Sequence, residues 1–140
     1  MGQPMNRLPT KPRALVVEDD RALADIIRLA LARAGHEVTV AHDGLRGLHL
    51  AQQSQFEVIV SDFQMPGLNG EKFLAGVRAS GESRDAILVL CSAKSYEINS
   101  ERLRDELGLK AVFYKPFSLN EMVKAIGSVN TLASVAPCIA

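Results

Sequence analysis

The stretch that decides the fold is Val58-Ile59-Val60-Ser61-Asp62, a short apolar run that ends on a carboxylate. Two further runs have the same form, since Leu15-Val16-Val17 leads into Glu18-Asp19-Asp20, and Val112-Phe113-Tyr114 leads into Lys115-Pro116. Short apolar runs rich in β-branched residues are typical of buried parallel strands. Because open α/β sheets bind ligands at the carboxyl ends of their strands, we expect the carboxylates and the lysine to meet in one crevice.

The composition excludes several classes of protein. Lys plus Arg and Asp plus Glu number 16 each, so no overall charge draws the chain to nucleic acid or to an anionic membrane. The two cysteines, Cys91 and Cys138, form no disulfide framework and suit a reducing compartment. No apolar stretch approaches the ~20 residues of a membrane span. We therefore expect a cytoplasmic protein without direct nucleic acid binding or membrane insertion.

The chain alternates between short apolar runs and helix-like segments, which is the pattern of repeated βαβ units. Residues 1–12 carry three prolines and predict a flexible leader, residues 13–130 form the domain, and residues 131–140 are a tail or the start of a linker. Right-handed crossovers place helices on both faces of a parallel sheet. The sequence therefore predicts an α/β fold of five βα units, (βα)5, arranged as a three-layer sandwich.

Capping and turn residues indicate where the helices and strands begin and end. The expected strands cover residues 15–17, 38–40, 58–61, 86–91 and 111–114. Asp20 is a suitable N-cap for the first helix, and Gly35 fits its end. The second helix begins near residue 44, the third follows the loop 63–69, and the fourth covers residues 96–107. Ser118, with Glu121 three residues on as a capping box, opens the fifth helix.

Three of the acids gather on neighbouring strand ends. Acids that follow a strand often serve only as helix N-caps or as favourable charges at a helix start, and that reading suffices for Asp20. Asp62, however, ends a strand expected to lie beside the one that leads into Glu18 and Asp19. Three carboxylates in one crevice repel one another and need a counter-charge, which a hard divalent cation with oxygen ligands supplies. The pattern favours Mg²⁺, which keeps several waters and leaves room for a phosphate oxygen.

Asp62, Lys115 and Ser92 suggest phosphate chemistry. A carboxylate beside a metal can attack a phosphoryl donor and form an acyl phosphate, although Asp62 alone would also fit local hydrogen bonding in a turn. The Lys115 ammonium could pair with Asp62 and then with a phosphoryl oxygen, whereas a lysine at a strand end is often merely solvated. A cis peptide before Pro116 would aim this lysine. Ser92 offers a hydroxyl to the same group, unless it is an ordinary turn serine.

These elements resemble the receiver domain of bacterial two-component response regulators. The resemblance covers residues 13–130, and it rests on the order and spacing of Glu18-Asp19, Asp62 with Met65-Pro66 and Gly70, Ser92-Ala93, and Lys115-Pro116-Phe117. It implies the flavodoxin-like, CheY-like fold, with a five-stranded parallel sheet of strand order 2-1-3-4-5. That strand order comes from the resemblance and not from the pattern of residues.

The resemblance also implies a role for each residue. Asp62 would be the phosphoacceptor, served by a histidine kinase, a histidine phosphotransfer protein or a small phosphodonor. Mg²⁺ would be held by the carboxylates of Asp19 and Asp62, by the backbone carbonyl of Gln64 and, through water, by Glu18. Ser92 would be the switch hydroxyl and Lys115 the cation that pairs with the phosphoryl group.

The implied protein is a signalling module. It would catalyse its own phosphorylation and dephosphorylation without turning over an external substrate. Its output would be altered binding to a downstream protein or output domain, or homodimerisation through the face of the fourth helix, fifth strand and fifth helix. Tyr114 is a candidate contact there, or else it simply covers the sheet edge.

One position departs from the family pattern, and it concerns how phosphorylation is signalled to a partner. Two other functions also compete with the receiver assignment. The family usually has Tyr or Phe three residues before the lysine, where this chain has Val112. A Mg²⁺-dependent phosphatase with an aspartyl nucleophile would also need a carboxylate acid/base, and such enzymes commonly place it two residues after the nucleophile, where this chain has Gln64. A flavin-binding module is disfavoured because the first strand leads into acids rather than into a phosphate cradle rich in Ser, Thr and Gly.

Overall fold

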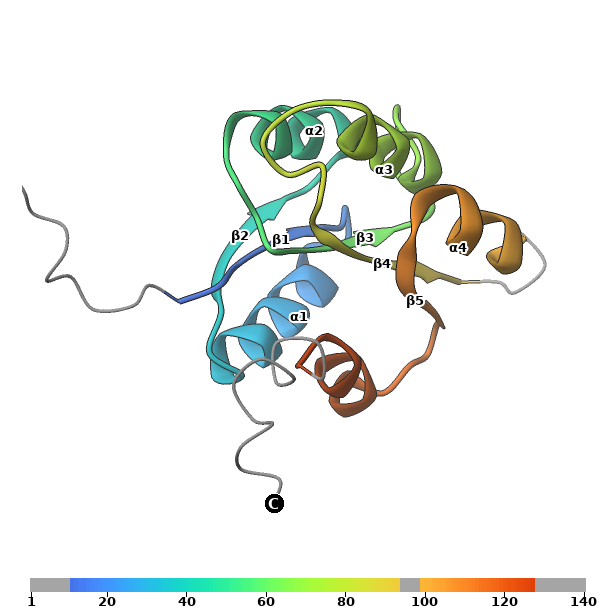
Figure 1. The fold of residues 1–140 in the computed structure, drawn as a ribbon. Helices are drawn as coiled ribbons and strands as arrows, with labels where there is room; N and C mark the ends of the chain where they lie inside the picture. Colours follow the sequence, from blue (N-terminus) through green and yellow to red (C-terminus); the bar gives the residue numbers. More distant parts are fainter. Residues whose placement is uncertain (1–10, 94–98, 128–140) are drawn as a thin grey trace, which may run out of the picture.

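The computed structural model describes residues 11–93 and 99–127. Within these ranges, five parallel strands form one sheet in the order β2-β1-β3-β4-β5, which confirms the expected strand order (Figure 1). The strands are β1 (Arg13–Val17), β2 (Glu37–Ala41), β3 (Val58–Asp62), β4 (Ile87–Ser92) and β5 (Leu109–Tyr114). Most of the expected leader and the whole expected tail, residues 131–140, lie outside the described residues.

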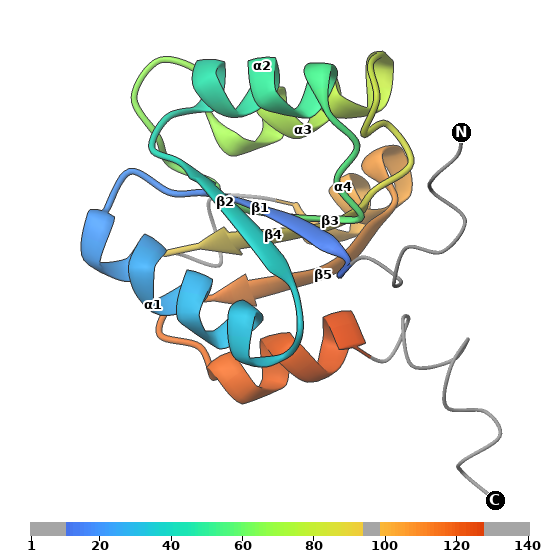
Figure 2. The ribbon, with the colours of Figure 1, turned by 90° about the vertical axis from the view of Figure 1, so that its left-hand side faces the viewer.

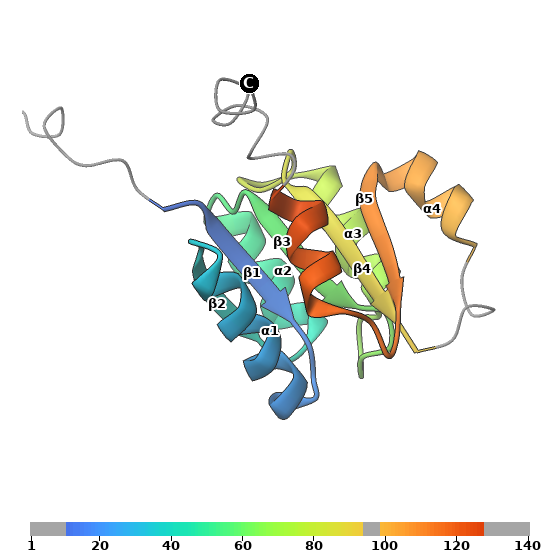
Figure 3. The ribbon, with the colours of Figure 1, turned by 90° about the horizontal axis from the view of Figure 1, so that it is seen from below.

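Helices cover both faces of the sheet, so the expected three-layer sandwich is confirmed. On one face lie α2 (Gly44–Gln53), α3 (Gly70–Ala79) and α4 (Ser100–Leu107), as Figure 2 shows. On the other face lie α1 (Arg21–Arg33) and a C-terminal helix described over residues 119–127, both visible in front of the sheet in Figure 3. No helix in the described ranges is long and apolar enough to cross a membrane.

The alternation of side chains along each strand builds two separate cores. Leu15 and Ile59 pack with the buried residues of α2, α3 and α4, whereas Val16 and Val60 pack with those of α1 and the C-terminal helix. Successive residues of a strand point to opposite faces of the sheet. Because both faces are covered, the central strands are apolar at nearly every position, which explains the continuous runs in the sequence.

Side-chain caps fix the starts of the helices. Asp20 accepts hydrogen bonds from the backbone N–H groups of Ala22 and Leu23, at 3.0 and 3.2 Å, which confirms it as the N-cap of α1. Ser118 Oγ accepts from the Glu121 N–H at 3.1 Å and caps the C-terminal helix. Gly35, with φ of 104°, follows α1 as expected for a helix stop.

The fourth helix begins later than expected. Asn99 stands in an extended conformation, and its side chain accepts the N–H of Arg102 at 3.0 Å, so α4 begins at Ser100 rather than at residue 96. Residues 96–98 of the expected helix lie outside the described ranges. The strand boundaries also shift slightly, since β4 extends to Ser92 and β5 begins at Leu109. Ser92 is therefore the last residue of β4 and not the first residue beyond it.

Candidate functional site

The carboxyl ends of the central strands bring the predicted acids together. Glu18 and Asp19 directly follow β1, and Asp62 ends the neighbouring strand β3. One carboxylate oxygen from each of the three lies within 4.8 Å of the others, and these residues are called the acidic cluster below. Glu18 and Asp62 are buried, with 2% and 5% of their surface exposed, whereas Asp19 is open to solvent. Solvent therefore reaches the cluster at Asp19.

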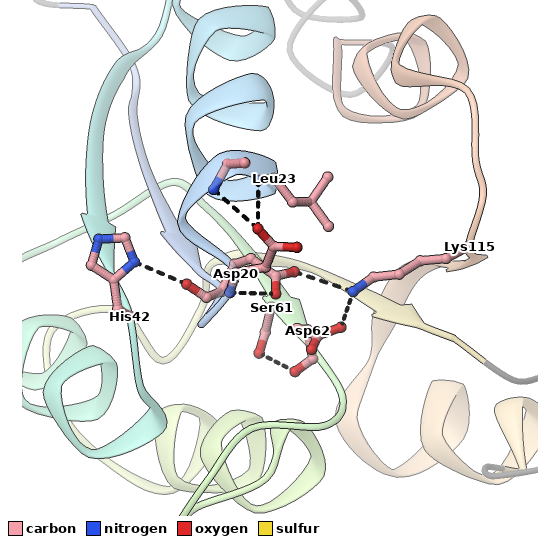
Figure 4. Close-up of polar contacts among 8 residues, drawn as sticks. Asp20, Leu23, His42, Ser61, Asp62 and Lys115 are labelled. Carbon is pink, nitrogen blue, oxygen red and sulfur yellow. Dashed lines mark hydrogen bonds and ion pairs between the residues drawn. The ribbon is translucent and has the colours of Figure 1, made fainter.

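Lys115 reaches into the acidic cluster from the end of β5. Its Nζ lies 2.8 Å from Asp62 Oδ1 and 3.4 Å from Glu18 Oε1 (Figure 4). The backbone N–H of Lys115 donates to the Ser92 carbonyl at 2.7 Å, and the Lys115–Pro116 peptide is cis, as the sequence suggested. The lysine is thus held at its backbone by β4 while its ammonium contacts two carboxylates.

Burial and mutual repulsion decide the protonation of the cluster. Burial, and then the charge of Asp62, raise the pKa of Glu18 to about 7, against the opposing effects of the Asp20 N–H and of Lys115. Burial also raises the pKa of Asp62, although the hydrogen bond and charge of Lys115 pull it down. One ammonium therefore does not balance three carboxylates. A hard divalent cation would supply the additional positive charge that three neighbouring carboxylates need.

Ser92 and Gln64 lie at the edge of this arrangement. Ser92 is fully buried at the end of β4, beside Lys115 through the backbone hydrogen bond described above. Gln64 is exposed in the loop after β3, and it lines an open pocket together with Asp19, Met65 and Asn69. The side chains of Asp19 and Gln64 thus border the same opening, next to the acidic cluster.

The side chains of β5 alternate between the two faces of the sheet. Val112 packs against the core on the α2, α3 and α4 side of the sheet. Phe113 packs on the opposite side, where its ring centroid lies 5.9 Å from that of Phe117. Val112 therefore occupies the inward side of the strand with a small side chain, where an aromatic ring is usual in the family that the sequence resembles.

Sequence reasoning missed His42. This residue directly follows β2, and its Nδ1 lies 3.0 Å from the backbone carbonyl oxygen of Glu18. The signal was available, because β2 is the other neighbour of β1 and its carboxyl end lies at the same edge of the sheet. The rule that selected Asp62 and Lys115 also applies to His42.

Comparisons with known proteins agree with this geometry. The family model described as "Response regulator receiver domain" matches residues 14–127. The chain is 35% identical over 112 residues to the response regulator MprA of Mycobacterium avium, covering 79% of this chain and 47% of MprA. It is 37% identical over 123 residues to a probable transcriptional regulatory protein of Picosynechococcus sp., covering 83% of this chain and 48% of that protein.

The fold comparison points the same way. The structure of the chemotaxis protein CheY4 of Vibrio cholerae superposes with a TM-score of 0.75 at 27% identity, covering 86% of this chain and 99% of CheY4. The chain spans about half the length of the curated relatives it matches. The competing phosphatase assignment is not favoured by any of these similarities. The sheet order, the acidic cluster and the family match together show that this chain belongs to the response regulator receiver domains, the phosphoacceptor signalling modules of two-component systems.

Proposed function

We propose that Asp62 is the phosphoacceptor and that its phosphorylation, dependent on Mg²⁺, changes the binding of a partner. The observation that carries this proposal is the pairing of a buried carboxylate with Lys115 at 2.8 Å, beside two further acids. Burial raises the pKa of Asp62, and the hydrogen bond and charge of Lys115 oppose that rise, so the lysine itself favours the ionised, nucleophilic form. An ionised aspartate can form a covalent acyl phosphate.

The acidic cluster fits Mg²⁺ because its donors are three carboxylate oxygens that lie close together, with Lys115 as the one cation in contact with them among the described residues. The carboxylates of Asp19 and Asp62 would hold the ion directly, with the backbone carbonyl of Gln64. Glu18, already bonded to the Asp20 N–H at 3.1 Å, would act through water. When bound, the ion would neutralise the carboxylates and the phosphoryl oxygens that approach them.

The protein residues then divide the phosphotransfer between them. A carboxylate oxygen of Asp62 forms a bond to phosphorus while the P–N bond of a phosphohistidine breaks, and the bonding electrons leave with the imidazole nitrogen. The Lys115 ammonium shifts its pairing from Asp62 to a phosphoryl oxygen, and the Ser92 hydroxyl donates to another. Water later hydrolyses the acyl phosphate and regenerates Asp62. This cycle acts on the module itself and turns over no external substrate.

Intact-mass measurement after incubation with acetyl phosphate and Mg²⁺ tests the proposal. We expect one added phosphoryl group on the wild-type chain and none on Asp62→Asn, because an amide is not the required nucleophile. Chelation of Mg²⁺ should also prevent the addition. Asp20→Asn is the matched control, since asparagine is an equally good N-cap and the change lies outside the acidic cluster. An undiminished adduct on Asp62→Asn would refute the assignment.

We further propose a histidine kinase or histidine phosphotransfer protein as the phosphodonor, in the cytoplasm, where the buried free thiol of Cys91 stays reduced. The output surface proposed is the face of α4, β5 and the C-terminal helix, used by a partner, an output domain or a second copy. Tyr114→Ala should leave phosphorylation of Asp62 nearly unchanged and weaken phosphorylation-dependent association, measured by light scattering. Unchanged association in a folded variant would contradict this role for Tyr114.

A further inference from the structure

His42 is held against the backbone of the acidic turn, on the side of the cluster opposite Lys115 (Figure 4). Its Nδ1 lies 3.0 Å from the carbonyl oxygen of Glu18, and the side chain is half-buried. A carbonyl oxygen can only accept a hydrogen bond, so Nδ1 must carry the proton and donate it. The contact therefore requires a proton on Nδ1 and fixes the orientation of the ring.

Two consecutive residues at the end of β2 hold the two peptide units that flank Glu18. The Glu18 N–H donates to the Ala41 carbonyl at 3.0 Å, which extends the β1–β2 ladder one step beyond the pair Val17 and Ala41. His42 then binds the Glu18 carbonyl, which belongs to the peptide joining Glu18 to Asp19. Because a peptide unit is planar, fixing its carbonyl also fixes the direction in which the chain leaves toward Asp19.

Asp19 depends on that backbone for its position. The Glu18 carboxylate is held by its own contacts, with Oε2 accepting the Asp20 N–H at 3.1 Å and Oε1 facing Lys115 at 3.4 Å. Among the described residues, the exposed Asp19 carboxylate takes part in no hydrogen bond or ion pair, although its charge acts on Asp62. The place of its oxygens near Asp62 is therefore set mainly by the course of the main chain.

We propose that His42 is a positioning residue for the cation site, which it serves by donating Nδ1–H to the Glu18 carbonyl and so orienting Asp19 toward Asp62. The inference rests on the proposed role of Asp19 as a Mg²⁺ ligand. Groups that orient metal ligands typically change metal affinity about 10-fold to 100-fold when they are removed. His42 orients Asp19 through a hydrogen bond to the backbone, and not through a contact with the Asp19 side chain.

Removal of the ring should disturb orientation more than stability. His42 borders an open pocket that Arg21 and Asp25 also line, so water can reach the Glu18 carbonyl when the ring is shortened. A water molecule can satisfy the oxygen, and no buried acceptor is left unpaired. A water molecule, however, does not connect the Glu18 carbonyl to β2 as the His42 ring does. The variant without the ring should therefore bind the cation more weakly while its thermal unfolding stays nearly unchanged. A merely structural role would not give this combination.

Calorimetric Mg²⁺ titration of three variants tests the inference, at about pH 8, where ordinary imidazoles are neutral. His42→Ala should weaken Mg²⁺ binding about ten-fold. His42→Asn should recover most of the affinity, because its amide places an N–H donor near the position of the ring Nδ1. His49→Ala is the matched control, since His49 is exposed on α2, and its affinity should equal that of the wild type.

A second measurement examines the contact without Mg²⁺. ¹⁵N NMR of the histidine-labelled, metal-free wild type should show the His42 proton on Nδ1, with the signal assigned from its loss in His42→Asn. A proton on Nε2 alone would overturn the inference even if His42→Ala failed to fold. Unchanged Mg²⁺ affinity in folded His42→Ala would also overturn it. No Mg²⁺ binding by the wild type would refute the proposed cation site instead, which separates the two failures.

Discussion

At the residue scale, Lys115 governs the charge balance of the site. Its ammonium contacts Asp62 at 2.8 Å and Glu18 at 3.4 Å, and it is the single cation that contacts the acidic cluster within the described part of the chain. Burial lowers the pKa of Lys115, but its contacts with Asp62 and Glu18 outweigh that effect and raise it. The lysine therefore stays charged, as its proposed pairing with a phosphoryl oxygen requires.

Cys91 should be inert in the folded protein. It lies in β4 opposite Asp62 in the ladder, with 1% of its surface exposed, and burial together with the Asp62 charge raises the pKa of its thiol. Because the thiolate is the reactive form, alkylation requires opening of the sheet. In a Cys138→Ser background, iodoacetamide should label Cys91 at least about 1,000-fold more slowly in the native than in the unfolded chain. Comparable rates would show that this end of β4 opens readily.

At the element scale, the loop after β3 depends on the close approach of α3 to Asp62. Gly70 is the first residue of α3, and its N–H donates to the Phe63 carbonyl at 2.7 Å. A Cβ at this position would overlap the Asp62 carbonyl oxygen and lie 2.8 Å from the Cα of Phe63. Both obstacles are backbone atoms, which cannot turn aside as a flexible side chain would.

Gly70→Ala should therefore cost about 2 kcal/mol or more of unfolding free energy, despite the better helix propensity of alanine. It should also slow phosphorylation, because the displaced backbone carries Asp62. Gly76→Ala is the matched control, since the atoms nearest to its Cβ all belong to the flexible Leu48 side chain, the first at 3.0 Å. Urea unfolding and the rate of the mass shift with acetyl phosphate measure both effects. Equal behaviour of the two variants would show that the approach at Gly70 is not required.

A second element-scale feature is the anchoring of the α4–β5 junction by Arg78. From α3, the guanidinium donates to the carbonyls of Leu107 and Gly108 at 2.6 and 3.1 Å, and to those of Arg84 and Ala86 at 2.8 and 2.7 Å. One side chain thereby satisfies the end of α4 and the segment that enters β4. The planar fork of arginine is suited to several fixed acceptors at once, whereas lysine offers a single centre.

Arg78→Ala should lower the unfolding free energy by about 2–3 kcal/mol, because several carbonyls lose a charged donor. Arg78→Lys should recover only part of this loss. Arg46→Ala, at an exposed position on α2, should stay within about 0.5 kcal/mol of the wild type in the same urea titration. A loss at Arg78 as small as that at Arg46 would contradict the anchoring role.

At the scale of the whole molecule, cation binding should be visible as stability. The acidic cluster joins β1 and β3 in a single sheet, so a ligand that neutralises it favours the folded chain as a whole. At Mg²⁺ concentrations about ten times the dissociation constant, the folded state should gain about 1.4 kcal/mol. Calorimetric unfolding with and without Mg²⁺ should show a rise in Tm for the wild type and a much smaller rise for Asp19→Asn. An equal rise in both would indicate that the ion binds elsewhere.

The surface of the whole molecule shows where apolar side chains remain open. Among the described residues, the large exposed hydrophobic side chains are Ile26, Leu29 and Leu45, on α1 and α2. The exposed positions of α4 are instead charged, and its Arg102 pairs with Glu71 and Glu106 at 3.2 and 2.9 Å. An output contact through α4 would therefore be largely polar, and its strength should fall as salt rises.

The sequence by itself determined the local structure and the candidate chemistry. Buried strands are recognisable as apolar runs because both faces of a parallel sheet are covered. Asp20 and Ser118 are recognisable caps because their side chains accept hydrogen bonds from free N–H groups at helix starts. The strand-end rule alone was enough to expect Asp62 and Lys115 in one crevice. The start of α4 was placed too early because the sequence pattern did not identify Asn99 as the N-cap of this helix.

Only the tertiary structure decided how these groups act on one another. The contacts of Lys115 with Asp62 and Glu18 join residues 53 and 97 positions apart, and the pKa of Glu18 near 7 arises from burial that no local pattern encodes. The role of His42 likewise depends on β2 lying beside β1. Local propensities act over a few residues, whereas charge, burial and backbone orientation in a crevice depend on which distant segments the fold brings together.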